Sequence, residues 1–255
     1  MPGAHRESII EQFTQQASGF AAAASLQDAG QLELMLDASR IAPRGRVLDV
    51  ACGPGIVTCA FAQRAAAAVG LDLVESMLER AAERAGALGL ANVEWVQGDV
   101  DALPWPEGAF DAVVSRFSLH HLEKPAAALG EMARVCARGG RLVICDLSPA
   151  PAKAEAFDAM ERLRDPSHVR AFSEGELREL IAATGAFGAV EVAHTHVALE
   201  LEAHLARSFP VDADAVRDEI IASLEDDHLG IRARRAGGRV EYSYSAVVLS
   251  AARLD

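Results

Sequence analysis

Positive charge is scarce in this sequence, and this bears on the kind of partner that it suits. The 255 residues carry 24 Lys and Arg against 37 Asp and Glu, a formal net charge of −13. Only Lys124 and Lys153 are lysines. Because binding to nucleic-acid phosphates depends on clustered Lys and Arg, we do not expect nucleic acid as a partner.

Cysteine motifs are also lacking. The four cysteines are Cys52, Cys59, Cys136 and Cys145, and none of them forms a Cys-x-x-Cys pair. Each lies inside an apolar run, which favours buried free thiols over disulfides or a zinc site. His194 and His196 are two residues apart on a predicted strand and so share a face, but two histidines alone make a weak metal site. We therefore expect no metal.

Long apolar runs are missing too. No stretch approaches the roughly 18 residues that a membrane-spanning helix needs. The N-terminal residues 1–7 are polar and no apolar core follows them, so we expect no signal peptide and a cytoplasmic location. Apolar residues make up 51% of the chain and charged residues 24%, which is typical of a globular protein.

Short apolar strands alternate with helices through the first part of the chain. We predict strands over residues 45–51, 67–72, 92–97, 110–115 and 141–146, and helices over 5–18, 27–38, 56–66, 76–88 and 125–136. Gly19 and Phe20 are expected to end the first helix. This rhythm predicts an α/β, Rossmann-like, doubly wound, mostly parallel seven-stranded sheet with helices on both faces.

The rhythm changes after Leu147. Residues 149–172 read as helical, and Ser173 and Glu176 have the spacing of a capping box. Strands are predicted over 187–199 and 239–253, with helices over 200–227. We expect one domain over 1–255, with N-terminal cap helices (1–40), a cofactor-binding core (41–148) and two lid insertions (149–172 and 200–230).

Chemically active residues stand at the ends of three successive predicted strands. Gly53 and Gly55 follow the first strand, Asp72 ends the second and Asp99 follows the third. Glycines let a backbone approach a ligand closely, and a carboxylate at the second strand end can accept both hydroxyls of a ribose. Because the carboxyl ends of parallel strands meet at one edge, the set predicts a nucleoside-containing cofactor.

The choice of cofactor rests on the residues around the glycine turn. A dinucleotide site usually has a third glycine, in the pattern Gly-x-Gly-x-x-Gly, but Thr58 stands at that position. Asp49 lies beside the turn, where a carboxylate is unfavourable next to pyrophosphate but suits the cationic groups of S-adenosylmethionine (SAM). The sequence therefore favours SAM over a nicotinamide nucleotide.

Four segments carry a family resemblance. The segment Val47-Leu-Asp-Val-Ala-Cys-Gly-Pro-Gly55 resembles motif I of class I SAM-dependent methyltransferases, and residues 98–111, 115–125 and 131–144 resemble the segments that follow it in that family. The chain looks most like the ubiquinone/menaquinone-biosynthesis-like (methyltransferase type 11) branch. The resemblance is strong over residues 45–147 and weak elsewhere. Ala51 departs from the pattern, because many members have glycine there.

The resemblance implies a set of cofactor-binding residues. The turn formed by Ala51, Cys52, Gly53 and Gly55 would contact the methionine part of SAM, with Asp49 in support. Asp72 would hold the ribose, Leu73 and Met77 would pack on the adenine, and Asp99 and Val100 would meet its polar edge. Ser115 and Arg116 would lie beside the cofactor.

Residues for the acceptor are less clearly marked. His120 and His121 follow the fourth strand, so that one of them could act as a general base, although they also belong to a motif common in the family. His168 and Arg170 lie in the first lid insertion and could orient a polar acceptor. We expect a small-molecule acceptor such as a quinone, phenol or nitrogen heterocycle, with S-adenosylhomocysteine (SAH) as the second product.

Several points stay open at this level. A nicotinamide-nucleotide-dependent oxidoreductase and a non-catalytic SAM-binding module are the alternatives. The sequence identifies neither the acceptor nor the choice among C-, N- and O-methylation. It also leaves the oligomeric state undetermined.

Overall fold

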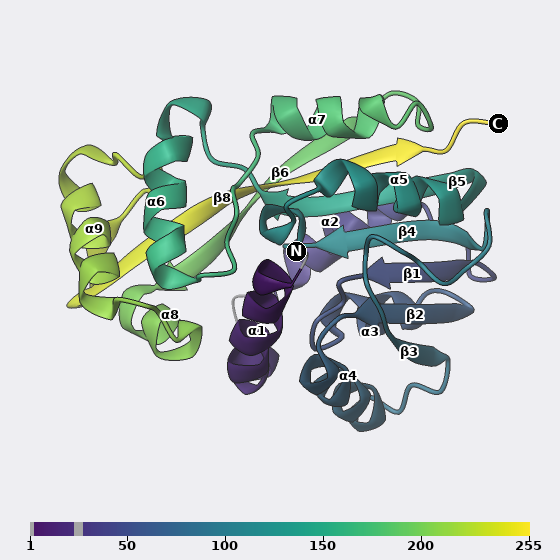
Figure 1. Cartoon of the computed structure of the whole chain (residues 1–255), viewed down its shortest axis with the longest axis horizontal. Coiled ribbons are helices and arrows are strands. Elements are labelled where there is room, and N and C mark those ends of the chain that lie inside the picture. Colours follow the sequence, from purple (N-terminus) through teal and green to yellow (C-terminus); the bar gives the residue numbers. More distant parts are fainter. Residues whose placement is uncertain (1–2, 23–27) are drawn as a thin grey trace.

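A computed structural model describes residues 3–22 and 28–255 of the chain, in which helices flank a single sheet (Figure 1). The helices are α1 (Ala4–Ala22), α2 (Ala29–Ser39), α3 (Ile56–Ala62), α4 (Glu75–Ala87), α5 (Pro125–Val135), α6 (Ala154–Arg164), α7 (Glu174–Ala183), α8 (Leu201–Ser208) and α9 (Ala213–Asp226), with short 3-10 turns η2 (Leu119–His121) and η3 (Pro151–Lys153). The strands are β1 (Arg46–Val50), β2 (Ala67–Asp72), β3 (Val93–Gln97), β4 (Phe110–Arg116), β5 (Cys136–Leu147), β6 (Glu191–Glu200), β7 (Arg234–Ala236) and β8 (Arg239–Ala252).

The sheet confirms the predicted fold class. Its order over the described residues is β3-β2-β1-β4-β5-β8-β6, with β7 paired to β8. The strands β1 to β5 pair in parallel, and β8 runs antiparallel to β5 and to β6. The chain moves outward from β1 to β3 and then returns to β4 on the other side of β1. This switch point opens a crevice at the carboxyl ends of β1 and β4.

The parallel strands are buried on both faces. Side chains on one face of the sheet, such as Leu48 and Val113, pack against α5 and α7. The intervening side chains, such as Val47 and Ala112, pack against α2 and α3. Strands covered on both faces are apolar at nearly every position, which is why their sequence shows continuous apolar runs rather than alternation.

A third core lies beside the parallel part of the sheet. The strands β6 and β8 extend past the other strands, and α6, α8 and α9 gather around the extension (Figure 1). Phe157 of α6, Ile220 of α9 and Tyr242 of β8 are buried together there. These helices come from the segments predicted as lid insertions. Their action as a lid, and the division of the chain into cap, core and insertions, stay predictions.

The first helix runs further than predicted. Gly19 and Phe20 do not end it, because α1 continues to Ala22. A Cβ atom on Gly19 would stand 3.1 Å from the Cβ of Arg207 in α8. Gly19 therefore marks a close approach of two helices rather than a helix end. The predicted start of the second helix at Gln27 lies outside the described residues, and α2 begins at Ala29.

The short strand β7 was not predicted, so the count of seven strands is wrong for the described residues, which form eight. It pairs with the start of β8 across Gly237 and Gly238, both of which have positive φ. Two adjacent glycines between short segments are typical of a hairpin turn, so the sequence does carry a signal for this strand pair.

Other boundaries also differ from the predictions. The helix predicted over 56–66 ends at Ala62, the strand predicted over 141–146 covers Cys136–Leu147, the strand predicted over 187–199 covers Glu191–Glu200, and residues 165–172 are not helical. The capping box at the start of α7 is confirmed, since Ser173 and Glu176 exchange both of its hydrogen bonds. The four cysteines are buried and free, as predicted.

Candidate active site

The turn after β1 has an unusual backbone. Ala51, Gly53 and Gly55 all have positive φ, at 56°, 51° and 73°. Left-handed conformations favour glycine. This explains why many proteins with the resembling motif have glycine at the position of Ala51. A Cβ on Gly53 would meet nothing within 4 Å, whereas a Cβ on Gly55 would stand 2.7 Å from the ring of Trp95. Gly53 therefore faces open space, and Gly55 permits tight packing.

Asp72 fastens this turn to the end of β2. Its carboxylate accepts the backbone N–H of Gly53 at 2.7 Å and the backbone N–H of Val74 at 2.9 Å. Burial raises the pKa of Asp72, and these backbone hydrogen bonds act in the opposite direction. Each oxygen accepts one of these bonds, so lone pairs remain for a ligand. Asp72 therefore both shapes the turn and offers acceptors at its edge.

Asp49 differs from the other polar groups near the turn because its hydrogen bonding is incomplete. One oxygen accepts the hydroxyl of Thr58 at 2.6 Å, and the other oxygen, Oδ1, is buried without any hydrogen-bond partner. Burial raises the pKa of Asp49 to about 7. A buried carboxylate oxygen without a partner is costly, and a cationic ligand would remove that cost. This position therefore favours a ligand group with a positive charge.

These residues border a cavity of about 270 Å³ at the switch point of the sheet. Ten of the twelve predicted cofactor residues line it: Asp49, Ala51, Cys52, Gly53, Asp72, Leu73, Met77, Asp99, Val100 and Arg116. The helix α1 contributes His5, Arg6, Ile9, Phe13 and Phe20 to the wall. Residues far apart in the sequence thus meet around one space, which we call the first cavity.

Two predicted cofactor residues lie behind this wall. Gly55 packs against Trp95 and Ala81, as its short Cβ distances show. Ser115 donates its hydroxyl to the carbonyl oxygen of Val50 at 2.6 Å and contacts the hydroxyl of Ser118 at the same distance. Both residues shape the cavity from outside its lining.

Charged groups at the far ends of the cavity already have partners. The carboxylate of Asp99 lies 3.1 Å from the guanidinium of Arg6, in a half-exposed ion pair. Arg116 donates to the side chain of Gln31 at 3.1 Å, and its guanidinium lies over the ring of Phe117. Burial lowers the pKa of Arg116. Any contact of Asp99 with an adenine would compete with Arg6.

The two predicted catalytic histidines have different surroundings. His120 Nδ1 lies 2.5 Å from Asp146 Oδ1, where both groups are buried. His121 Nδ1 lies 3.1 Å from the carbonyl oxygen of Ser167 and 3.0 Å from its hydroxyl. Since a carbonyl only accepts, His121 Nδ1 carries a hydrogen and its Nε2 presents a lone pair. Burial lowers the pKa of His121 to about 3, so this ring stays uncharged.

A smaller second cavity of about 70 Å³ adjoins the first one. Phe20, Phe117 and His121 line both cavities, so these three side chains stand between them. The remaining lining residues are His120, Leu147, Glu161, Arg164, Asp165, Val197, Leu199, His204, Arg207 and Tyr244. The second cavity therefore connects the predicted catalytic pair with the helices that pack around the extended strands.

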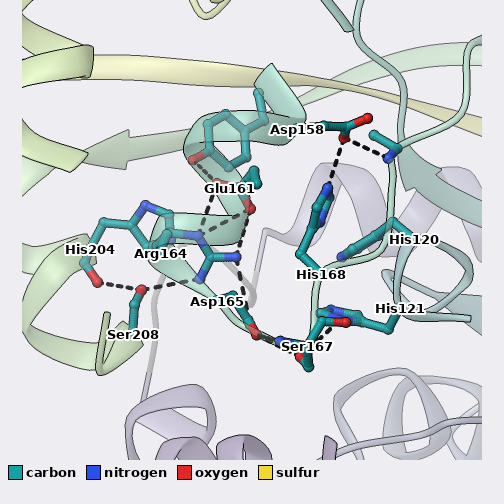
Figure 2. Close-up of polar contacts among 12 residues, drawn as sticks. His120, His121, Asp158, Glu161, Arg164, Asp165, Ser167, His168, His204 and Ser208 are labelled. Carbon is teal, nitrogen blue, oxygen red and sulfur yellow. Dashed lines mark hydrogen bonds and ion pairs between the residues drawn. The ribbon is translucent and has the colours of Figure 1, made fainter. Parts of the chain in front are cut away.

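One wall of the second cavity is a buried polar cluster (Figure 2). Arg164 and Glu161 form an ion pair in which Nη2 and Oε2 are 2.7 Å apart. Tyr244 donates its hydroxyl to Glu161 at 2.5 Å, and Arg164 also lies 3.8 Å from Asp165. Asp165 accepts the hydroxyl of Ser167 at 2.5 Å, which links the cluster to His121.

The two predicted acceptor-binding residues lie outside both cavities. His168 is buried and pairs with Asp158 at 2.7 Å, and Figure 2 shows it above His120 and His121. Arg170 is half-exposed, pairs with Glu176 and lies over the ring of Phe172. The structure does not bring either side chain to the cavity walls. Their role toward an acceptor stays a prediction.

Sequence reasoning missed Asp146, Glu161, Arg164 and Tyr244. Asp146 was detectable, because it ends β5 in the same way that Asp72 ends β2. Glu161 and Arg164 are three residues apart on a helix, a spacing that is typical of exposed ion pairs. Nothing in the sequence marks them as buried. Among the described residues, no group of three or more His, Cys, Asp or Glu is placed to hold a metal ion, and no helix is long and apolar enough to cross a membrane.

Comparisons with known proteins agree with this geometry. A family profile described as "Methyltransferase domain" matches residues 48–144. The uncharacterized methyltransferase YcgJ of Bacillus subtilis is 34% identical over 154 residues, which cover 60% of this chain and 61% of that protein. The ubiquinone/menaquinone biosynthesis C-methyltransferase UbiE of Roseobacter denitrificans is 40% identical over 133 residues, covering 49% of this chain and 52% of that protein.

A solved structure extends the similarity over most of the fold. The crystal structure of YcgJ superposes with a TM-score of 0.79 at 25% identity, covering 89% of this chain and 99% of that one. The aligned sequence, by contrast, spans only 52% to 61% of the length of the curated relatives named above. The family profile matches residues 48–144, whereas the shared architecture covers most of the chain.

The chain thus contains a class I SAM-dependent methyltransferase domain, as the sequence predicts. Relatives named as ubiquinone/menaquinone-biosynthesis or demethylmenaquinone methyltransferases are similar to it over about half of its length. No comparison favours the nicotinamide-nucleotide oxidoreductase.

Proposed function

We propose that this protein transfers a methyl group from SAM to a small-molecule acceptor and releases SAH. When bound, SAM supplies an electrophilic methyl group on a sulfonium sulfur. The protein supplies position and a space from which water is excluded, since a displacement at carbon depends mainly on alignment. The first cavity would hold the methyl donor, and the adjoining second cavity would hold the acceptor.

The proposal depends most on the surroundings of Asp49. Its Oδ1 is buried and without a partner in the wall of the first cavity, beside the open backbone of Gly53. SAM carries an ammonium and a sulfonium, and an ionised Asp49 complements positive charge at this point. The donor set fits SAM better than a pyrophosphate, which the same carboxylate would repel.

The acceptor proposal rests on the second cavity. Phe20, Phe117 and the aliphatic residues Leu147, Val197 and Leu199 give it apolar walls, and the polar cluster lines the rest. A small quinone, phenol or nitrogen heterocycle has the matching combination of flat apolar surface and polar edge. The name of the UbiE relative, a quinone-biosynthesis C-methyltransferase, supports this class. The net charge of −13 disfavours nucleic acid.

Calorimetry with SAH tests the proposal directly. We expect SAH to bind and NAD not to bind. Absence of SAH binding at millimolar ligand would refute the proposal, and NAD binding in its place would favour the oxidoreductase. Incubation with SAM and a metabolite panel, read by mass spectrometry as a gain of 14 mass units, then separates an enzyme from a non-catalytic SAM-binding module.

A further inference from the structure

Asp146 is an acceptor-only group held in one orientation at the end of β5. Its Oδ2 accepts the backbone N–H of Leu119 at 2.8 Å, and its Oδ1 accepts the backbone N–H of Leu147 at 2.7 Å. The remaining contact is the ring of His120 at 2.5 Å. Burial opposes ionisation of Asp146, but His120 and the two backbone donors hold the pKa of this carboxyl below its usual value. An ionised carboxylate only accepts, so His120 Nδ1 carries the hydrogen of this contact. The carboxylate thereby fixes both the tautomer and the orientation of the ring.

The other nitrogen of His120 is available for chemistry. Among the residues that the structure describes, His120 Nε2 has no hydrogen-bond partner, and the residue lines the second cavity. The ring of His120 lies 5.5 Å from the ring of His168, and Figure 2 shows the two rings next to each other. A base oriented by a buried carboxylate, with its free nitrogen facing a pocket, is the arrangement used to activate a nucleophile.

We propose that His120 and Asp146 form a base dyad for the methyl acceptor, and that the acceptor is therefore a hydroxyl compound that loses a proton on methylation. This inference rests on the proposed methyltransferase function. His120 is the catalytic residue because its Nε2 faces the acceptor. Asp146 is a positioning residue because it acts through His120. A tertiary amine or a thioether would need no such base.

The acceptor hydroxyl gives its proton to His120 Nε2, and a lone pair of the oxygen forms a bond to the methyl carbon. The carbon–sulfur bond breaks, and its electron pair returns to sulfur as the neutral thioether of SAH. The imidazolium then loses its proton to solvent, which restores the base.

The charged groups around His120 support this assignment. Asp146 and Glu161 raise the pKa of His120, while burial and Arg164 lower it, and the net change is upward. The ring of His121 lies 4.2 Å away, stays uncharged, and stands near Asp165 and His168. One histidine of the pair is thus disposed to hold a proton and the other is not, a separation typical of acid–base sites.

The first test is the protonation of His120 itself, followed by NMR of labelled histidine in the full-length protein. We expect a His120 pKa above 6.5 with the hydrogen on Nδ1 in the neutral form. Asp146→Asn should lower this pKa by about one unit or more. Asp158→Asn is the matched control, because Asp158 also pairs with a buried histidine but lines neither cavity. Equal effects of the two variants, or no effect of Asp146→Asn, would overturn the dyad.

The second test uses 4-nitrophenol as a probe, since its ionised form absorbs visible light. With SAH present, we expect wild-type protein at pH 6 to hold bound probe as the phenolate, and Asp146→Asn to reduce the bound phenolate by roughly tenfold, which corresponds to about one pKa unit. Wild-type protein that binds SAH but shows no bound phenolate at millimolar probe would overturn the hydroxyl class. Failure to bind SAH would instead refute the proposed function.

Discussion

The residues around the first cavity (the first region) and those around the second cavity (the second region) meet at His121. The two regions differ in whether their buried charged groups have partners. Around the first cavity, carboxylates at the ends of β1 and β2 are held by backbone amides and one hydroxyl, and Asp49 keeps an oxygen without any partner. Around the second cavity, Glu161, Arg164 and Tyr244 satisfy one another. The first region thus keeps a buried carboxylate oxygen that a cation would satisfy, whereas the charged cluster of the second region is satisfied without a ligand.

This difference assigns separate tasks to the two regions. An unpartnered carboxylate favours ligand binding at the expense of stability, and a closed polar network fixes the shape of a pocket. Substitutions in the first region should therefore alter cofactor affinity, and substitutions in the second should alter stability or acceptor chemistry.

The largest effect is expected in the second region. Arg164→Met should lower the free energy of unfolding by about 3–5 kcal/mol, because it leaves Glu161 buried without its counter-charge. Urea unfolding followed by circular dichroism measures this. Arg80→Met is the matched control, since Arg80 and Glu83 have the same spacing and a 2.7 Å contact but are exposed. The control should cost less than about 1 kcal/mol. Similar losses in both variants would contradict the account.

Substitution of Gly53 and substitution of Gly55 should have different effects, although both glycines lie in one turn. Gly55→Ala should cost about 2–4 kcal/mol of stability, because positive φ and a crowded Cβ position add together. Gly53→Ala should cost about 1 kcal/mol for its φ alone. Its methyl group projects into the first cavity, so SAH affinity should fall by roughly tenfold, or about 1.4 kcal/mol. Thermal unfolding and calorimetry compare the two variants. Equal stability losses would show that burial at Gly55 has been misjudged.

Asp49→Asn should raise the stability of the protein and weaken its binding of SAH. The pKa of Asp49 is about 7 in the folded state, above the ordinary value of 3.8, so the folded state binds more protons than the unfolded state between these values. Stability therefore falls as pH rises from about 4 to 7 and is then level. The variant should be more stable than wild type at pH 8, by on the order of 1–3 kcal/mol.

Binding should show the opposite dependence on pH. The ammonium group, which SAH shares with SAM, binds the ionised form of Asp49, so wild-type affinity for SAH should fall by roughly tenfold per pH unit below pH 7. Asp49→Asn should bind SAH weakly with little pH dependence. An equally steep pH dependence in the variant would place the titrating group elsewhere.

The smallest effect is expected at the exposed end of the first cavity. Arg6→Ala removes the ion pair with Asp99, whose side chains are 50% and 35% exposed. Exposed pairs contribute little, so the free energy of unfolding should change by less than about 1 kcal/mol. SAH affinity should stay within about threefold of wild type. A much larger loss of affinity would mean that α1 is essential to the cofactor site.

The first region could be predicted from sequence for definite reasons. Its strands are buried on both faces, so apolar runs mark them, and its site residues stand at strand ends, where topology brings them together. Ten of the predicted cofactor residues line the first cavity for this reason. Asp146 follows the same strand-end rule and was overlooked.

The second region could not be predicted in the same way. Glu161 and Arg164 are charged residues at helical spacing, a pattern that usually marks a solvent-exposed face. Their burial depends on the extension of β6 and β8 and on helices that follow later in the chain. His168 and Arg170 were chosen because they are polar residues in an insertion, and neither reaches a cavity wall. Local sequence does not encode which side of an insertion faces the site.

The most direct measurement compares SAH dissociation constants of wild type, Asp49→Asn and Tyr244→Phe at pH 8 by calorimetry. Tyr244→Phe removes one hydroxyl from the polar cluster and nothing from the first cavity. The account predicts that Asp49→Asn weakens SAH binding by roughly tenfold or more, about 1.4 kcal/mol, while Tyr244→Phe changes it less than about threefold. Equal weakening in the two variants, or unchanged binding in Asp49→Asn, would contradict the assignment of the cofactor to the first region.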